Sequence, residues 1–290
     1  MRKAFHLASI LIAFVAIPLF AQKGPIDELG FHADKLYDFS GVDSVNLFNG
    51  NLVISIPIGP RYTVSSNLSY QFTLVFNGKT TDTETWLEYD PVTGGDTKPA
   101  SRVLPAVGSN AGVGWRVSLG RLLPPVSTGR TNDSLDDDTW VYEGPAGDEH
   151  NVSVANPHDG MRMHVLSDEA IEIEFGSGEI HKFEIENAVW RLKQMRDRFG
   201  NAVNVSYTYS LDGKKELTWT VTDTASRSHT VTFVNYSGMA DGWSRGQTVS
   251  QIDLQGFNSE TATYAFTYSG DSVPVLTTLA QPDGTEYDLT

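Results

Sequence analysis

The chain has 290 residues, of which 40% are hydrophobic and 11% aromatic, so it can bury a sizeable core in one large or two medium domains. Its net charge of −15 repels phosphate backbones and anionic lipid surfaces, which argues against nucleic acid as a partner. The absence of cysteine excludes disulfides, thiol catalysis and cysteine-based zinc sites.

Residues 1–21 have the pattern of a signal peptide. Arg2 and Lys3 give a positive start, an apolar run continues to Phe20, and the small residue Ala21 precedes the expected cut. An uncleaved membrane anchor is the alternative, but the run is short for a span. We therefore expect a secreted or cell-surface protein with no membrane span after signal cleavage.

An N-terminal β region is predicted for residues 22–138. Apolar side chains alternate with others from Leu52 to Ile58, and again from Leu68 to Phe76. This period of two predicts strands with one apolar and one polar face. Two stretches rich in turn-forming residues, Lys79 to Gly112 and Pro124 to Asp138, are predicted to be long loops.

Shorter strands are expected next, with residues 139–190 forming hairpins that lead into a repeated region. Ile171, Ile173 and Phe175 alternate with glutamates, and the run from Gly176 to Gly178 supplies the positive φ that a tight hairpin needs. No long amphipathic helix is apparent. The predicted fold class is therefore all-β, built from antiparallel hairpins.

Residues 191–290 contain degenerate repeats in which a polar turn leads into an aromatic strand. The best-defined turn contains Asp197, and an apolar pair spaced three residues apart precedes several of the turns. Such self-similarity is typical of stacked β units. The residues assigned to the repeat are Asp197, Gly200, Asn201, Tyr207, Tyr209, Asp223, Tyr236, Asp253, Tyr264, Tyr268, Asp283, Gly284 and Tyr287, and the apolar pairs are Leu192/Met195, Val249/Ile252 and Leu276/Leu279.

The run from Arg191 to Gly213 resembles the YD repeat of RHS (rearrangement hot spot) proteins. That pattern has a leucine-led strand, an Asp-x-x-Gly-Asn turn and a strand ending in Tyr-x-Tyr-Asp, where Ser210 replaces the last residue here. Val45 to Pro57 is similar to the opening strand of RHS and toxin-complex chains, and Gly112 to Leu119 is similar to their Gly-x-Gly-Trp strand. The resemblance covers most of residues 42–290.

This resemblance implies a β-sheet ribbon that spirals into a hollow shell, which often holds a toxic C-terminal domain. The implied partners are the missing C-terminal repeats or a payload domain. Because only three repeats and part of a fourth are present, the chain is expected to be an N-terminal piece of such a shell.

Candidate chemistry is sparse. Glu149–His150 suggests half of an acid–base pair, although a hairpin tip is the favoured interpretation, and His181 is expected on the inner face of a strand. An acidic run near Asp137 suggests a calcium site, but it lacks the spacing of an EF-hand loop. We predict no catalytic residues, no cofactor and no metal. The tryptophans Trp86 and Trp243 lie in Gly/Asp-rich stretches and are the candidates for ligand binding.

The sequence thus favours a non-catalytic, secreted structural module that forms the N-terminal part of an RHS/YD-repeat shell. The alternative is a cell-surface adhesin or carbohydrate-binding β protein, with surface glycans as partners. A polysaccharide hydrolase is a third hypothesis, but it needs two converging carboxylates and no motif supports them.

Overall fold

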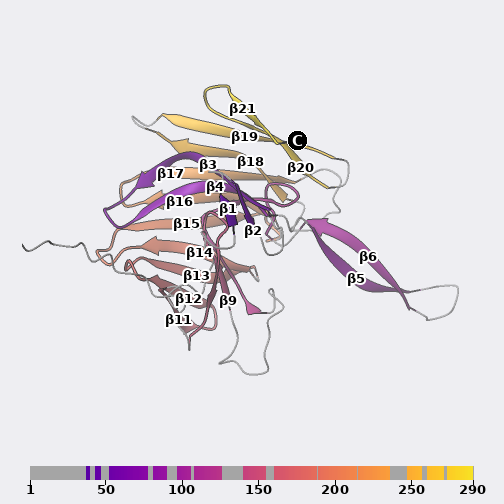
Figure 1. The fold of residues 1–290 in the computed structure, drawn as a ribbon, viewed down its shortest axis with the longest axis horizontal. Helices are drawn as coiled ribbons and strands as arrows, with labels where there is room; N and C mark the ends of the chain where they lie inside the picture. The colour runs from indigo at the N-terminus through magenta and orange to yellow at the C-terminus, as the bar shows by residue number, and fades with distance from the viewer. Residues whose placement is uncertain are drawn as a thin grey trace, which may run out of the picture.

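The computed structural model describes residues 37–39, 43–46, 52–77, 81–89, 97–105, 108–125, 140–154, 160–187, 189–213, 215–235, 247–256, 260–270 and 273–289. For the strands between residues 37 and 46 and between 81 and 105, the description covers the backbone alone. These residues form antiparallel β-sheets almost throughout (Figure 1), which confirms the all-β prediction.

The largest sheet has eleven strands in the order of the chain. Figure 1 shows them stacked from β11 at the bottom to β21 at the top. The hairpins from Met161 onward and the repeats belong to this one sheet, whereas the hairpin of residues 140–152 belongs to another. Its strands are β11 (Met161–Ser167), β12 (Ala170–Phe175), β13 (Ile180–Glu186), β14 (Val189–Arg196), β15 (Ala202–Tyr209), β16 (Glu216–Asp223), β17 (Ser228–Asn235), β18 (Gln247–Gln255), β19 (Thr261–Ser269), β20 (Val275–Ala280) and β21 (Glu286–Asp288).

The N-terminal region forms two further sheets that lie against the large one. A five-stranded sheet has the order β1-β2-β3-β4-β7, and a three-stranded sheet has the order β10-β9-β8. In Figure 1, β3 and β4 cross in front of β15 to β18. The strands are β1 (Tyr37–Phe39), β2 (Asp43–Asn46), β3 (Leu52–Thr63), β4 (Ser69–Asn77), β7 (Trp115–Ser118), β8 (Arg121–Leu123), β9 (Trp140–Glu143) and β10 (Glu149–Val152).

The loop predicted from Lys79 to Gly112 is wrong over most of its length. Strands β5 (Thr81–Tyr89) and β6 (Thr97–Pro105) pair as a two-stranded hairpin, which points away from the stacked sheets in Figure 1. Threonine and aromatic residues favour strands, and both strands of an isolated hairpin are edges that tolerate proline such as Pro99. The abundance of turn-forming residues therefore misled the sequence prediction.

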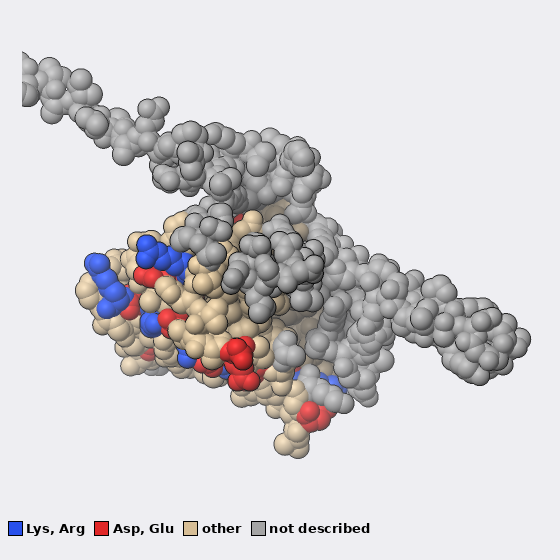
Figure 2. Space-filling model, turned by 90° about the horizontal axis from the view of Figure 1, so that it is seen from below, with Lys and Arg blue, Asp and Glu red and all other residues tan. Residues whose placement is uncertain are grey.

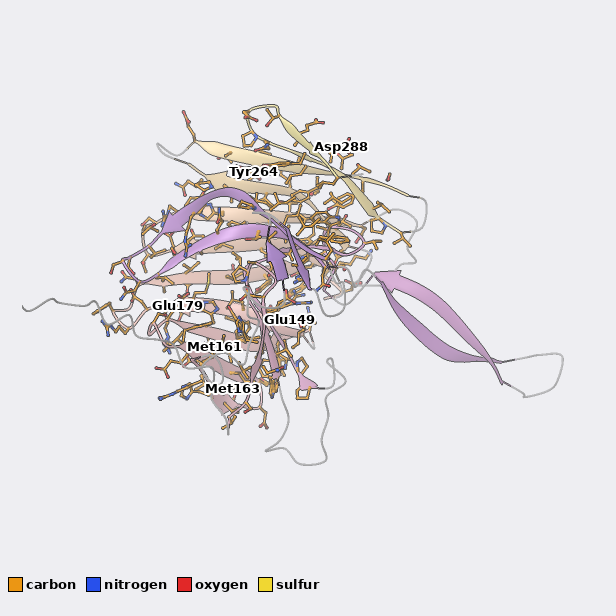
Figure 3. The ribbon with its side chains drawn as sticks, in the orientation of Figure 1. Glu149, Met161, Met163, Glu179, Tyr264 and Asp288 are labelled. Carbon is orange, nitrogen blue, oxygen red and sulfur yellow. The ribbon has the colours of Figure 1, made fainter. Side chains whose placement is uncertain are left out.

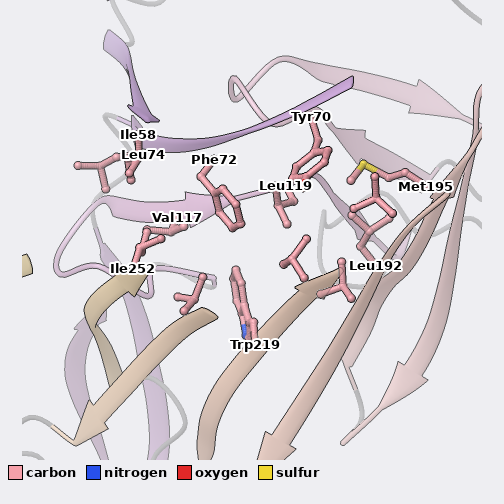
Figure 4. Close-up of a cluster of buried hydrophobic side chains, with 14 of the residues drawn as sticks. Ile58, Tyr70, Phe72, Leu74, Val117, Leu119, Leu192, Met195, Trp219 and Ile252 are labelled. Atoms are coloured by element: carbon pink, nitrogen blue, oxygen red, sulfur yellow. The ribbon is translucent and has the colours of Figure 1, made fainter. Parts of the chain in front are cut away.

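One hydrophobic core joins the large sheet to the N-terminal sheets. Figure 4 shows side chains of β3, β4 and β7 facing side chains of β14, β16 and β18 across the interface. Phe72, Leu74 and Ile252 are 0% exposed, and Trp219 is 7% exposed. Burial of each such side chain contributes about 1.5–3 kcal/mol. The apolar face that period-two alternation predicts is therefore the face that the N-terminal region covers.

A five-residue turn recurs at five hairpins whose turn residues the structure describes in full. The first residue donates its N–H to the carbonyl of the fifth, and the fourth donates its N–H to the carbonyl of the first. This pattern is a type I turn followed by a bulged residue with positive φ. Glycine holds that fourth position at four of the turns, as the sequence predicted for Gly178, Gly200 and Gly284, but Ser226 holds it at the fifth with a φ of 64°. The turns span residues 144–148, 175–179, 197–201, 223–227 and 281–285.

The apolar pairs spaced by three residues are explained by β-bulges. In an ideal strand, residues three apart face opposite sides, yet Leu192 and Met195 are both buried. The pairing skips Lys193, and this extra residue returns Met195 to the inner face. The pairing likewise skips Leu217, Ser250 and Thr277, so each of β14, β16, β18 and β20 carries a bulge.

The repeating unit is therefore a bulged strand, a turn and an unbulged strand. The bulge residues Ser250 and Thr277 also donate their hydroxyls to the carbonyls of Thr232 (3.1 Å) and Thr267 (3.0 Å) on the preceding strand. The extra backbone residue thus gains a hydrogen bond at two of the four bulges.

Replacing Ser226 with glycine should stabilise the protein by about 0.5–1 kcal/mol, because a side chain at positive φ is strained. The matched change Gly200→Ala should destabilise it by a similar amount, since no atom lies within 4 Å of an added Cβ and only backbone strain acts. Urea unfolding midpoints measure both effects. Equal midpoints for Ser226→Gly and the wild type would contradict the assignment of strain.

Candidate functional site

Two of the repeat tyrosines, Tyr207 and Tyr268, donate hydrogen bonds to backbone carbonyls at the bulges. The hydroxyl of Tyr207 donates to the carbonyl of Leu192 (2.7 Å), and the hydroxyl of Tyr268 donates to the carbonyl of Val249 (2.5 Å). Each acceptor is the first residue of an apolar pair, where the bulge interrupts the strand pairing. The tyrosines therefore satisfy carbonyls that the bulges withdraw from the ladder.

At the bulge in β16, an amide side chain takes this role. The side chain of Gln247 accepts a hydrogen bond from the backbone N–H of Glu216 (2.7 Å) and donates to the carbonyl of Glu216 (2.5 Å). Sequence reasoning missed Gln247, because the pattern contains only the tyrosines. Tyr236, which the sequence predicts to be the equivalent of Tyr207 in this unit, lies outside the described residues. The strand pairing shows that Asn235 holds the position that corresponds to Tyr207.

Two of the repeat aspartates, Asp197 and Asp223, organise the turns that they begin. Asp197 is 3% exposed and accepts hydrogen bonds from the backbone N–H groups of Phe199 (2.8 Å) and Asn201 (3.0 Å). Its other oxygen accepts from the side chains of Asn201 (2.7 Å) and Ser65 (2.7 Å). Burial alone would raise the pKa of Asp197, but these hydrogen bonds lower it to about 2. The carboxylate stays charged and fully bonded at the turn.

Asp223 occupies the same position in the next unit. One oxygen accepts from the backbone N–H groups of Ala225 (2.9 Å) and Arg227 (3.1 Å). The other accepts from the guanidinium of Arg227 (2.7 Å) and the hydroxyl of Tyr70 (2.9 Å). Burial would raise the pKa of Asp223, and its hydrogen bonds with Arg227 and Tyr70 lower it.

Both aspartates therefore contact the hairpin formed by β3 and β4. Ser65 binds Asp197 and Tyr70 binds Asp223, so two successive repeat turns hold the same N-terminal hairpin. The guanidinium of Arg227 adds a hydrogen bond to the carbonyl of Thr63 (2.8 Å). We call this set, Ser65, Tyr70, Asp197, Asp223, Arg227 and His229, the seam.

His229 completes the seam at its most buried point. Its Nδ1 accepts the backbone N–H of Gln255 (3.0 Å), so the proton of the neutral ring lies on Nε2, which contacts the hydroxyl of Tyr70 (2.8 Å). Tyr70 in turn donates to Asp223. Burial lowers the pKa of His229 to about 4, although the Asp223 carboxylate acts in the opposite direction. The seam therefore requires a neutral histidine.

Several sequence-predicted repeat residues lie elsewhere than expected. Asp253 does not begin a turn, because it lies within β18 and accepts the hydroxyl of Thr263 (2.7 Å); the turn follows Gln255. Asp283 is the third residue of its turn, whereas Asp197 is the first of its own, and it accepts the backbone N–H of Thr285 (2.9 Å). Tyr287 pairs with Leu279 and is 43% exposed, so it does not match Tyr207.

The two tryptophans proposed for ligand binding cannot be placed in a site. The backbone of Trp86 lies in β5, its side chain is outside the described atoms, and Trp243 is outside the described residues. The acidic run near Asp137 and the predicted signal peptide are outside them too. Tyr264 is half-buried in β19, where it pairs with Ile252 of β18.

A cavity of about 360 Å³ beside the seam is lined by two histidine–carboxylate pairs. His181 is 4% exposed, which confirms its inward position, and it contacts Glu179 (2.8 Å) and the hydroxyl of Tyr142 (3.1 Å). His150 contacts Asp148 (2.8 Å), not the Glu149 that sequence suggested. The adjacent Glu149 points to the other face because side chains alternate along β10.

The described part of the chain contains no group of three or more histidine, aspartate or glutamate side chains arranged for a metal ion. None of its helical segments has the length and hydropathy that crossing a membrane requires. No family model matches the chain, and no curated protein matches it in sequence. The resemblance to RHS proteins therefore stays a prediction.

The change Tyr70→Phe should destabilise the protein by about 1–3 kcal/mol, because Asp223 and His229 would each lose a buried partner. Tyr287→Phe is the matched control and should change stability by less than about 0.5 kcal/mol, since this side chain is exposed. Urea unfolding measures both. Equal effects of the two changes would refute the importance of the seam.

Stability should fall as the pH drops from 6.5 towards 4. The folded-state pKa of His229 is about 4, below the ordinary 6.5, so the unfolded chain binds this proton first and acidification favours unfolding. A proton on Nδ1 would also face the N–H of Gln255. One such group contributes at most about 1.4 kcal/mol per pH unit.

The change His229→Gln removes this titration while keeping a polar side chain. Unfolding free energies at several pH values between 4.5 and 7 should therefore depend less on pH in the variant than in the wild type. Parallel pH dependences would show that His229 is not responsible.

Proposed function

We propose that this chain is a non-catalytic structural module whose large sheet forms part of a protein wall. The observation that carries the proposal is the order of that sheet: eleven strands follow the chain, and the same bulged unit recurs at every second strand from β14 to β20. Such an array lengthens by adding units that contact only their neighbours. This is the architecture that a wall requires.

The outer face of the sheet suits a wall that remains in water. Ion pairs occur on its first strands: Arg196 of β14 binds Glu172 of β12 (2.8 Å), and Lys182 binds Glu184 along β13 (2.6 Å). Figure 2, which views the molecule from below, at the β11 end of the sheet, shows acidic and basic side chains interspersed there. Further along, neutral hydroxyls pair across strands, as at Thr208–Thr218 (2.6 Å). Threonine favours exposed strands without adding charge.

The N-terminal sheets hold one part of this wall in a fixed position. They cover the inner face of β14 to β18, and the seam holds them in place through Asp197 and Asp223. In our proposal, the module is secreted and is the N-terminal part of an RHS/YD-repeat shell that encloses a C-terminal domain. The supports are the repeat pattern, its turns and the leader-like N-terminus.

Electron microscopy of the longest natural translation product that contains this chain tests the proposal. We expect the ribbon to continue beyond β21 through further bulged units and to curve around an enclosed domain. A product whose sheet ends at β21, or whose later units build no enclosure, would contradict the proposed role as a shell wall.

A further inference from the structure

The hairpin of β5 and β6 extends away from the stacked sheets (Figure 1). No third strand pairs with it in the part of the chain that the structure describes. A two-stranded hairpin by itself is at best marginally stable in water, and both of its strands are edges with unpaired backbone groups. The proposed wall gives this hairpin no role, so we asked what its edges would bind.

Two prolines show which backbone groups of the hairpin face outwards. Pro99 and Pro105 lie opposite Leu87 and Thr81 in a pairing without register shifts. A proline has no N–H, so neither pair is one of the hydrogen-bonded pairs of the ladder. Because hydrogen-bonded and non-hydrogen-bonded pairs alternate, the backbone groups at every odd-numbered position of β5 and β6 point away from the other strand.

The two edges of the hairpin therefore differ. The outer edge of β6 lacks two donors, because Pro99 and Pro105 occupy outward-facing positions, and proline on an edge strand opposes the addition of another strand. The outer edge of β5 contains no proline and offers a complete row of N–H and C=O groups. These groups belong to Thr81, Thr83, Thr85, Leu87 and Tyr89. The β6 edge is thus closed to a further strand, and the β5 edge is open.

The charged positions of β5 favour a basic neighbour. Asp82, Glu84 and Glu88 hold three of the four even-numbered positions, and the strand has no basic residue. Within the hairpin, the positions opposite Glu84 and Glu88 hold Arg102 and Lys98. Opposite charges at facing positions of neighbouring strands are favourable, and like charges are unfavourable. A third strand on the open edge should therefore also present basic residues to the acidic positions.

The register on the open edge strengthens this preference. The even-numbered residues of β5 would form non-hydrogen-bonded pairs with an added strand, and facing Cα atoms are only about 4.5 Å apart in such pairs. The odd-numbered positions hold three threonines, a leucine and a tyrosine, so they favour uncharged strand-forming residues opposite them. The best ligand therefore alternates basic and uncharged residues.

A second copy of β5 does not meet this requirement. Antiparallel pairing of the whole strand with its copy centres on Thr85 and places Asp82 opposite Glu88 twice. The net charge of −15 on each chain adds repulsion between two copies, whereas it attracts a basic segment.

We propose that the open edge of β5 binds an extended basic segment of another protein as a third strand. Lysine or arginine residues of that segment face Asp82, Glu84 and Glu88, and uncharged residues alternate with them. Backbone hydrogen bonds supply affinity and the alternating charges supply specificity, which is the general logic of strand addition. This inference goes beyond the proposed wall function and does not rest on it.

Fluorescence polarisation with labelled nine-residue peptides and the full chain tests the proposal, since β5 has nine residues. The first peptide alternates threonine or valine with lysine, and the second has glutamate in place of lysine. The third is the lysine peptide with methylated backbone nitrogens at its threonine and valine positions, which removes the N–H groups that would bind β5. We expect the first peptide to bind at least about tenfold more tightly than the other two.

Three results would overturn the proposal. Absence of binding by the lysine peptide would exclude the site. Equal binding of the glutamate peptide would exclude selection by charge. Equal binding of the methylated peptide would show attraction to an acidic surface without strand addition.

Prolines at two facing positions locate the site on one edge. Thr85→Pro removes an outward-facing donor from the open edge, as Pro99 does on the other edge, and should weaken binding of the lysine peptide at least about tenfold. Ser101→Pro, at the directly opposing position, is the matched control and should bind normally because the β6 edge is already closed. Full affinity in Thr85→Pro would overturn the assignment.

Removing two charges tests the same edge without altering the backbone, so it is informative even if a proline unfolds the hairpin. Asp82→Asn with Glu84→Gln should weaken binding of the lysine peptide about fivefold, because two favourable pairs are lost. Glu149→Gln with Asp288→Asn removes the same charge from two exposed positions on the body of the molecule (Figure 3) and should bind like the wild type. Equal affinities of the two double variants would overturn the proposal.

Discussion

The apolar inner face of the long sheet must be covered, and the rest of the structure follows from how this is done. An antiparallel sheet of this kind has one wet and one dry face, and the dry face here belongs to consecutive strands that lie far in sequence from the hairpin that covers them. The hairpin of β3 and β4 packs across several of them at once. Leu74 and Phe72 fill the interface, while Tyr70 and Ser65 bind the repeat turns. Apolar packing supplies stability, and the polar contacts fix one relative position.

The polar contact between the β3–β4 hairpin and the repeat turns tolerates few substitutions because it is buried. Hydrogen bonds run from Gln255 through His229 and Tyr70 to Asp223, and each of these groups has a defined donor or acceptor role. In a medium of low polarity, a satisfied network specifies one arrangement, and an unsatisfied member is costly. The buried polar groups of the seam are paired.

The repeat tolerates much substitution because its requirements are local and few. A bulge must return two apolar side chains to the inner face, a turn must allow one positive φ, and an isolated carbonyl must find a donor. Tyr207 and Tyr268 supply the donor for that carbonyl with a hydroxyl, and Gln247 supplies it with an amide. Ser226 adopts the positive φ of the turn although its side chain makes that conformation strained. Sequence similarity between units is therefore weak although their geometry is shared.

The sequence by itself determined the all-β class, the apolar face of the strands with clear period-two alternation and the glycines of the turns, because these depend on side-chain alternation and backbone freedom within a few residues; it missed the hairpin of β5 and β6. It also showed the apolar pairs spaced by three, but not that bulges produce them. Only the tertiary structure decided that Asp197 and Asp223 bind Ser65 and Tyr70. It likewise placed Asp253 in a strand. These contacts join residues up to 153 positions apart, as for Tyr70 and Asp223, and no local pattern encodes which distant strands will meet.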